Sequence, residues 1–182
     1  MARARSFEPR RLDVAAFADA AAELSGEVDQ RSLARLAAAV PALPGDALPA
    51  PVHWQVRGEA RPVAGGRREV RMHLKATTSV ALECQRCLQP LSEPLAVDRW
   101  FRFVADEDEA ARLDELSEDD VLVSSRSFDL LALVEDELIL ALPLIPRHDT
   151  CPQPLPVPPA DTDEAAEAPN PFAALAVLRR PD

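Results

Sequence analysis

The sequence predicts an α+β domain, in which an antiparallel β-meander or small barrel-like sheet packs against an N-terminal helix and a long helix near residues 128–142. Two observations favour this fold class. The middle of the chain alternates apolar and polar residues over long stretches, as half-buried strands do, and helical patterns flank it on both sides. The 182 residues are enough to bury a core that needs neither disulfides nor a metal.

Helical patterns come first along the chain. Over residues 9–24 apolar residues recur every four positions, Pro9 suits a first turn, and Gly26 is expected to end the helix. A second short helix is expected over residues 32–40, because Pro41 follows and removes the backbone donor that a longer helix needs.

Strand patterns follow. Alternating stretches predict strands at residues 53–60, 69–84 and 95–104, and Gly65 and Gly66 supply a turn between the first two. The second stretch is long enough that we expect a bend or a bulge within it. Consecutive strands of this kind typically form an antiparallel meander.

An acidic segment and a helix complete the predicted domain. Residues 105–120 are strongly acidic and are expected to form a solvated loop or frayed helix inserted into the domain. The long helix is capped by Ser127 or Asp129 and ended by Pro143, with residues 135–137 facing outward.

The C-terminal part differs in composition. Residues 1–151 are expected to form the single α+β domain, and residues 152–169, rich in proline and acidic residues, a disordered linker. Residues 170–178 restart a short helix with Asn170 as cap and Pro171 in the first turn. The apolar side chains that follow, beginning with Phe172, predict a partner-binding motif.

Charge and hydropathy indicate a soluble cytoplasmic protein. No apolar run approaches the roughly 18 residues that cross a bilayer, and the N-terminus lacks the pattern of a secretory signal. The net charge is −11, yet residues 1–103 carry 15 basic and 12 acidic residues, whereas residues 104–182 carry 5 and 19. The acidic half disfavours nucleic acid, and the basic half leaves room for a phosphate-binding patch.

The cysteines are the clearest candidates for chemistry. Cys84-Gln-Arg-Cys87 ends a predicted strand, and a thiolate pair at this spacing is half of a tetrahedral zinc site. His148-x-x-Cys151 offers the other half, so zinc is the one cofactor that the sequence suggests. In the alternative interpretation the thiols only pack and His148 caps the preceding helix. A thioredoxin-type redox role requires the motif to open a helix in a βαβ unit, which this context does not provide.

A second candidate site is a basic stripe along the predicted hairpin. Arg57, Arg71 and Lys75 share the outward phase of their strands, and Arg86 lies at the hairpin end, so the four could contact RNA phosphates. The alternative is an ordinary solvated face balanced by nearby glutamates, with few aromatics for stacking on bases. No catalytic constellation or phosphate-binding glycine loop is present in the sequence, which indicates a protein without enzymatic activity.

Three stretches together resemble the YceD family, the large ribosomal RNA subunit accumulation proteins. They are Glu83–Pro90, Phe128–His148 and Asn170–Leu178, in the order and spacing of that family. Some relatives look as though they carry a second CxxC after the long helix, where this chain has His148 and Cys151.

The resemblance implies a non-catalytic role in synthesis, processing or stability of 23S ribosomal RNA, and hence in ribosome biogenesis. The implied partners are the 23S ribosomal RNA precursor or proteins that assemble or process the large subunit. Two alternatives remain open: an acidic adaptor that binds protein without contacting RNA, and a zinc-dependent or redox-active CxxC protein.

Overall fold

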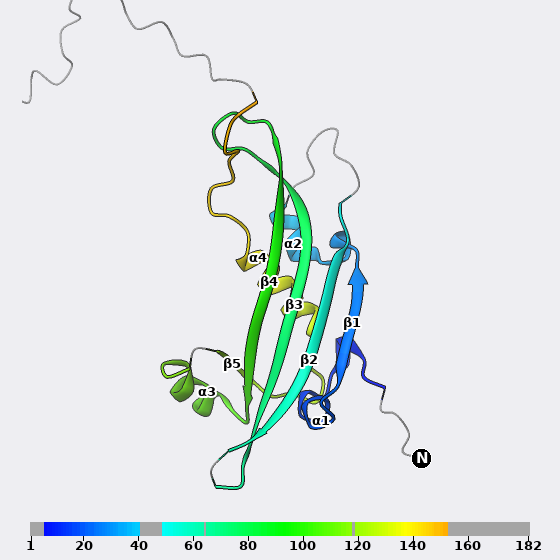
Figure 1. Cartoon of the computed structure of the whole chain (residues 1–182), viewed down its shortest axis with the longest axis vertical. Helices are drawn as coiled ribbons and strands as arrows, with labels where there is room; N and C mark the ends of the chain where they lie inside the picture. Colours follow the sequence, from blue (N-terminus) through cyan, green and yellow to red (C-terminus); the bar gives the residue numbers. More distant parts are fainter. Residues whose placement is uncertain (1–5, 41–48, 64, 118, 153–182) are drawn as a thin grey trace, which may run out of the picture.

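The computed structural model describes residues 6–40, 49–63, 65–117 and 119–152 (Figure 1). Four α-helices and five strands lie in this part of the chain, with two short 3-10 turns near the N-terminus. In chain order they are η1 (Pro9–Arg11), α1 (Val14–Asp19), β1 (Glu23–Val28), η2 (Gln30–Ser32), α2 (Ala34–Ala39), β2 (Val52–Pro62), β3 (Arg68–Glu83), β4 (Pro90–Val104), α3 (Glu107–Asp114), β5 (Asp120–Val123) and α4 (Leu130–Leu140).

The strands form one mixed sheet in the order β1-β2-β3-β4-β5. β1 to β4 are antiparallel neighbours, which confirms the predicted meander, and β5 is added parallel to β4. The sheet is open, so the barrel-like alternative is wrong for the described residues. Helices α1, α2 and α4 pack on one face, so the apolar side chains are buried by helices and not by closure of the sheet.

The longest pairing joins β3 to β4. It runs from Val70 opposite Phe103 to Glu83 opposite Pro90 with a constant register, so of the expected bend or bulge the bulge is wrong. Alternating burial confirms the predicted strands, although β4 begins five residues earlier than expected. The turn from β2 to β3 contains Gly65 and Gly66 with φ of +84° and +72°, which glycine adopts readily.

The core lies between the helix-covered face of the sheet and the helices. Inward side chains of β2, β3 and β4 alternate with outward polar ones, and the apolar face of α4 packs against them. The largest fully buried side chains include Phe17, Phe101, Leu12, Leu36, Met72, Leu74, Leu130 and Leu138.

The N-terminal helix predicted over residues 9–24 is wrong. Leu12 is extended and exchanges two backbone hydrogen bonds with Phe128, at 2.8 and 2.9 Å, so a continuous helix cannot pass through it. Asp13 then caps the short helix α1 by accepting from the Ala16 N–H. Tertiary pairing overrides the local helical pattern here.

Because a helix is expected up to Gly26, strand β1 is not predicted. Gly26, expected to end a helix, lies inside β1 opposite Trp54. A Cβ atom at this position would lie 2.7 Å from the Trp54 ring, so only glycine leaves room for the indole. The short helix expected over residues 32–40 corresponds to α2 and is confirmed in its central part.

The acidic segment is more ordered than a solvated loop. Asp106 accepts a hydrogen bond from the Glu109 N–H and begins α3, whose first turn carries three further acidic residues at the favourable end of the helix dipole. Asp120 already belongs to β5. A four-residue strand is too short for its periodicity to be recognised in the sequence.

Helix α4 begins after its predicted cap, Asp129, but two of its acidic residues do not face outward as predicted. The Glu135 carboxylate is buried and accepts hydrogen bonds from the backbone N–H groups of Arg35 and Leu36, at 2.6 and 3.1 Å. It thereby caps the start of α2. Glu137 is also buried; burial raises the pKa of its carboxyl, although Arg99 lies 3.4 Å away.

Replacing Glu135 should therefore destabilise the fold more than replacing its neighbour Asp136, which is half exposed and also pairs with Arg35. Glu135→Ala leaves the backbone N–H groups of Arg35 and Leu36 without this acceptor. It should lower the free energy of unfolding by about 2 kcal/mol at pH 7. Asp136→Ala should cost about 0.5 kcal/mol or less. Urea unfolding measures both.

The difference should depend on pH. Burial opposes ionisation of Glu135, but the Leu36 and Arg35 N–H groups and the Arg35 guanidinium outweigh it and lower the pKa. Because the pKa of Glu135 is lower in the folded state, its ionised carboxylate stabilises the protein at pH above the unfolded-state pKa of about 4.3. This stabilisation is lost as the pH falls through the folded-state pKa. The difference in the free energy of unfolding between wild type and Glu135→Ala should therefore become smaller in acid. A difference that grows in acid would contradict the capping role of the Glu135 carboxylate.

Candidate metal centre

The first half of the site is the turn between β3 and β4. Cys84 follows the last residue of β3, and its backbone closes the turn twice: the Cys84 N–H donates to the Gln89 carbonyl at 3.0 Å, and its carbonyl accepts from the Leu88 N–H at 2.8 Å. Leu88 adopts a positive φ of 57° to complete the turn. These bonds hold Cys84 and Cys87 on one side of a tight knuckle.

The second half arrives from the segment after α4. Figure 1 shows this segment, yellow to orange, running from α4 to the tip of the β3–β4 hairpin. The Gln85 N–H donates to the Pro146 carbonyl at 2.9 Å, which places the second knuckle, His148 to Cys151, beside the first, Cys84 to Cys87. Two stretches more than 60 residues apart therefore meet at the end of the sheet.

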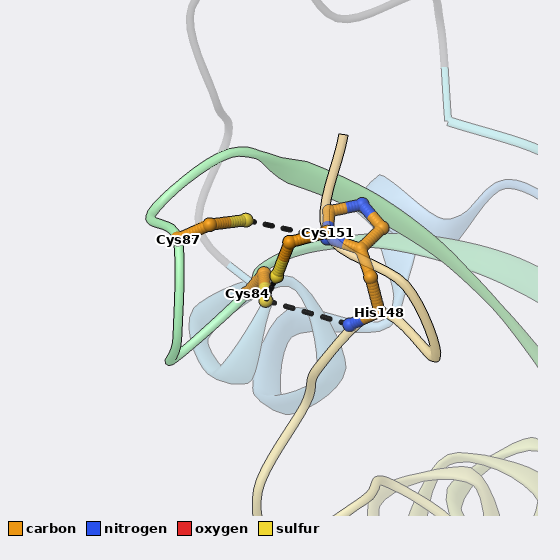
Figure 2. Close-up of side chains that lie close together, drawn as sticks. All are labelled: Cys84, Cys87, His148 and Cys151. Atoms are coloured by element: carbon orange, nitrogen blue, oxygen red, sulfur yellow. Dashed lines mark hydrogen bonds between the residues drawn. The ribbon is translucent and has the colours of Figure 1, made fainter. Parts of the chain in front are cut away.

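The four side chains converge with their donor atoms facing one another (Figure 2). Their sulfur and nitrogen atoms all lie within 4.8 Å of one another. The Cys84 and Cys151 sulfurs are 4.0 Å apart, and the Cys87 sulfur is 3.5 Å from His148 Nδ1. Tetrahedral zinc, with bonds of about 2.3 Å to sulfur and 2.0–2.1 Å to nitrogen, requires separations of about 3.8 and 3.6 Å.

The histidine is oriented for such a role. His148 Nε2 lies 3.1 Å from the Pro90 carbonyl, so a proton on Nε2 is donated there and the lone pair of Nδ1 points at the sulfurs. The alternative in which His148 caps the preceding helix is wrong, because α4 ends at Leu140 and the imidazole contacts the hairpin instead.

The surroundings stabilise thiolate at Cys84. Burial opposes its ionisation, but backbone N–H groups of His148, Arg86 and Cys87 outweigh burial and lower the pKa of Cys84 to about 5. The His148 N–H lies 3.4 Å from this sulfur. At Cys87 burial raises the pKa of the thiol, and the neighbouring sulfurs act in the same direction.

Arg86 ties the two knuckles together. Its Nε is 3.0 Å from the Cys151 sulfur, and its Nη2 donates to the carbonyls of His148 and Asp149 at 2.8 and 3.3 Å. A guanidinium here offsets the negative charge of clustered thiolates. As predicted, the CxxC lies in a turn between antiparallel strands, unlike the helix-opening motif of a thioredoxin.

The structure separates the members of the predicted basic stripe. Arg86 is engaged at the knuckles, and Arg71 is 11% exposed and ion-paired with Asp119. Lys75 lies on the outward face of the sheet with its ammonium 2.8 Å from an Asp98 oxygen. Most of the charge that the sequence offers to phosphates is therefore compensated within the protein.

Arg57 differs from the others. It is exposed, and among the described residues no carboxylate forms an ion pair with it. Its guanidinium instead lies 5.6 Å from the Trp100 ring centre. Trp100 is not among the predicted site residues, although its position in the strand, out of phase with Phe101 and Phe103, places it on the outward face.

Two further predictions fall partly or wholly outside the described residues: the linker over 152–169, of which only Pro152 is described, and the motif of Asn170, Pro171 and Phe172. Within the part that is described, no helix is long and apolar enough to span a bilayer.

Comparison with known proteins identifies the family of this chain. The sequence profile of the family described as "Large ribosomal RNA subunit accumulation protein YceD" matches residues 72–179, which include all four knuckle residues. The protein of that name from Haemophilus influenzae is 41% identical over 113 residues, covering 58% of this chain and 63% of the relative. The chain belongs to the YceD family. No solved structure matches it.

Proposed function

We propose that this protein is a non-catalytic factor in the accumulation of large-subunit ribosomal RNA, acting in the synthesis, processing or stability of 23S ribosomal RNA. The observation that carries the proposal is the family match, which extends from β3 to residue 179 and spans both knuckles and α4. Its partners are the 23S ribosomal RNA precursor or proteins that assemble or process the large subunit.

The knuckles in this proposal are structural. Cys84, Cys87, His148 and Cys151 hold one zinc ion, whose role is to cross-link the hairpin tip to the segment after α4. The donor separations of 4.0 and 3.5 Å and the Nε2 contact of His148 support this assignment. The linked knuckles form a rigid end of the domain, from which residues 152–169 lead to the partner-binding motif at 170–178.

Protein purified under reducing conditions with zinc present should contain about one zinc per chain. His148→Ala should lose the ion, and the double replacement of Cys84 and Cys87 by serine should do so too. His53→Ala is the matched control, because His53 is an exposed histidine far from the knuckles in the sheet and should leave the zinc content unchanged.

Elemental analysis by mass spectrometry measures the zinc, and circular dichroism checks that each variant is folded. Wild-type protein that is folded without zinc and does not bind added zinc would contradict the proposed site. Equal zinc in His148→Ala and His53→Ala would remove His148 from the ligand set.

The proposed function itself is tested in cells. A strain lacking the protein should show a lowered ratio of 23S to 16S ribosomal RNA, and the wild-type gene should restore it. The knuckle variants should restore it poorly, because the hairpin tip loses its cross-link, whereas His53→Ala should restore it fully. A normal ratio in the deletion strain would overturn the proposed function.

A further inference from the structure

The outward face of the sheet carries an aromatic stack formed by Trp100 and His73. Figure 1 shows helices α2 and α4 on the far side of β2 to β4, and no described helix covers the near side. On this near face Trp100 stands directly opposite His73 in the β3–β4 pairing. The two rings are parallel, with an interplanar angle of 7° and centroids 4.5 Å apart.

Arginines surround the stack. The guanidinium carbons of Arg71, Arg57 and Arg61 lie 4.7, 5.6 and 5.9 Å from the Trp100 ring centre. Arg71 is ion-paired with Asp119, and Arg61 with Glu59. Arg57 is the member of this group that keeps an exposed guanidinium without an ion pair among the described residues.

A shallow hollow adjoins the stack. It measures about 240 Å³ and is lined by Glu23, Gln55, Arg57, His73 and Lys75. Pockets that bury a drug-sized ligand start at about 300 Å³, so this hollow suits a single phosphate or sugar and not an enclosed small molecule. Arg57 and Lys75 line it together with Glu23, and because Lys75 is paired with Asp98, Arg57 is the cation available to an anionic group.

We propose that this face binds one unpaired nucleotide of RNA, with the base stacked beside Trp100 and His73 and its phosphate in the hollow next to Arg57. Aromatic rings stack on every base, and arginine adds cation–π attraction and a phosphate contact. The wider face is charge-balanced by Glu59, Glu69 and Asp98, so stacking contributes more of the affinity than ionic contacts do.

The inference deepens the proposed function by naming where RNA would contact the protein, and it rests on that function only for the identity of the RNA. The choice of RNA over a protein segment follows from the stack. A flat, parallel pair of rings flanked by guanidinium groups offers a surface for another planar ring, together with a cation at the distance of its phosphate.

The test is fluorescence anisotropy of a labelled single-stranded oligouridine of eight nucleotides, titrated with the full chain. Trp100→Ala should weaken binding about tenfold or more, and Trp100→Phe should retain most of it because the ring is kept. Arg57→Ala should weaken it about fivefold, because a cation–π contact and a phosphate contact are lost. Arg112→Ala removes the same charge from α3, away from the stack, and should have no effect.

Two controls separate stacking from a general charge effect. The slope of the logarithm of the binding constant against the logarithm of the salt concentration should be shallow, about −0.7 to −1.4 for one or two phosphates on a single strand. A duplex of equal length should bind at least tenfold more weakly. Unchanged binding by folded Trp100→Ala, equal binding of duplex, or no binding by the wild type would each overturn the proposal.

Cellular tests keep this inference separate from the proposed function. If Trp100→Ala restores the ribosomal RNA ratio in the deletion strain and binds oligouridine like wild type, the stack is not an RNA site while the function stands. If the deletion strain is normal but the oligouridine results hold, the function fails and the stack stands. A photoreactive residue at Gln55 that cross-links protein and never RNA in cells would also overturn the RNA assignment.

Discussion

The long antiparallel pairing of β3 with β4 determines both faces of the sheet and the position of its cysteine-bearing end. Its constant register from Val70 to Glu83 fixes which residues face the helices and which face outward. The same register places Trp100 opposite His73 on the outer face. Because the turn follows directly after Glu83, it also carries Cys84 to the end of the sheet, where the segment after α4 can reach it.

Several charged residues that the sequence predicts to be exposed join distant segments of the chain. Glu135 of α4 caps α2, and Arg86 bonds to the segment that holds Cys151. Arg71 is ion-paired with Asp119 beside β5. Most charged side chains of the sheet are therefore paired within the protein. A partner that binds this surface would depend on shape and stacking more than on excess positive charge.

The sequence predicted the fold where the pattern is long and local, and failed where pairing is distant. Sixteen residues of β3 alternate clearly, and α4 carries its own cap, so both elements could be recognised. Six-residue β1 follows directly after an alanine-rich, helix-like stretch, and its pairing with β2 makes it a strand. The proximity of His148 to Cys87 followed from spacing and donor type, whereas the roles of Arg86 and Glu135 depend on tertiary contacts that no local pattern shows.

The proposed zinc ion would join the hairpin tip to the segment after α4, and zinc K-edge X-ray absorption of the zinc-loaded protein would reveal its ligands. We expect three sulfurs at about 2.3 Å and one nitrogen at about 2.0–2.1 Å from the zinc. This shell requires Cys84, Cys87 and Cys151 together, because the chain has no other cysteine. A shell of oxygen and nitrogen alone, or one with only two sulfurs, would contradict the ligand set of three cysteines and one histidine.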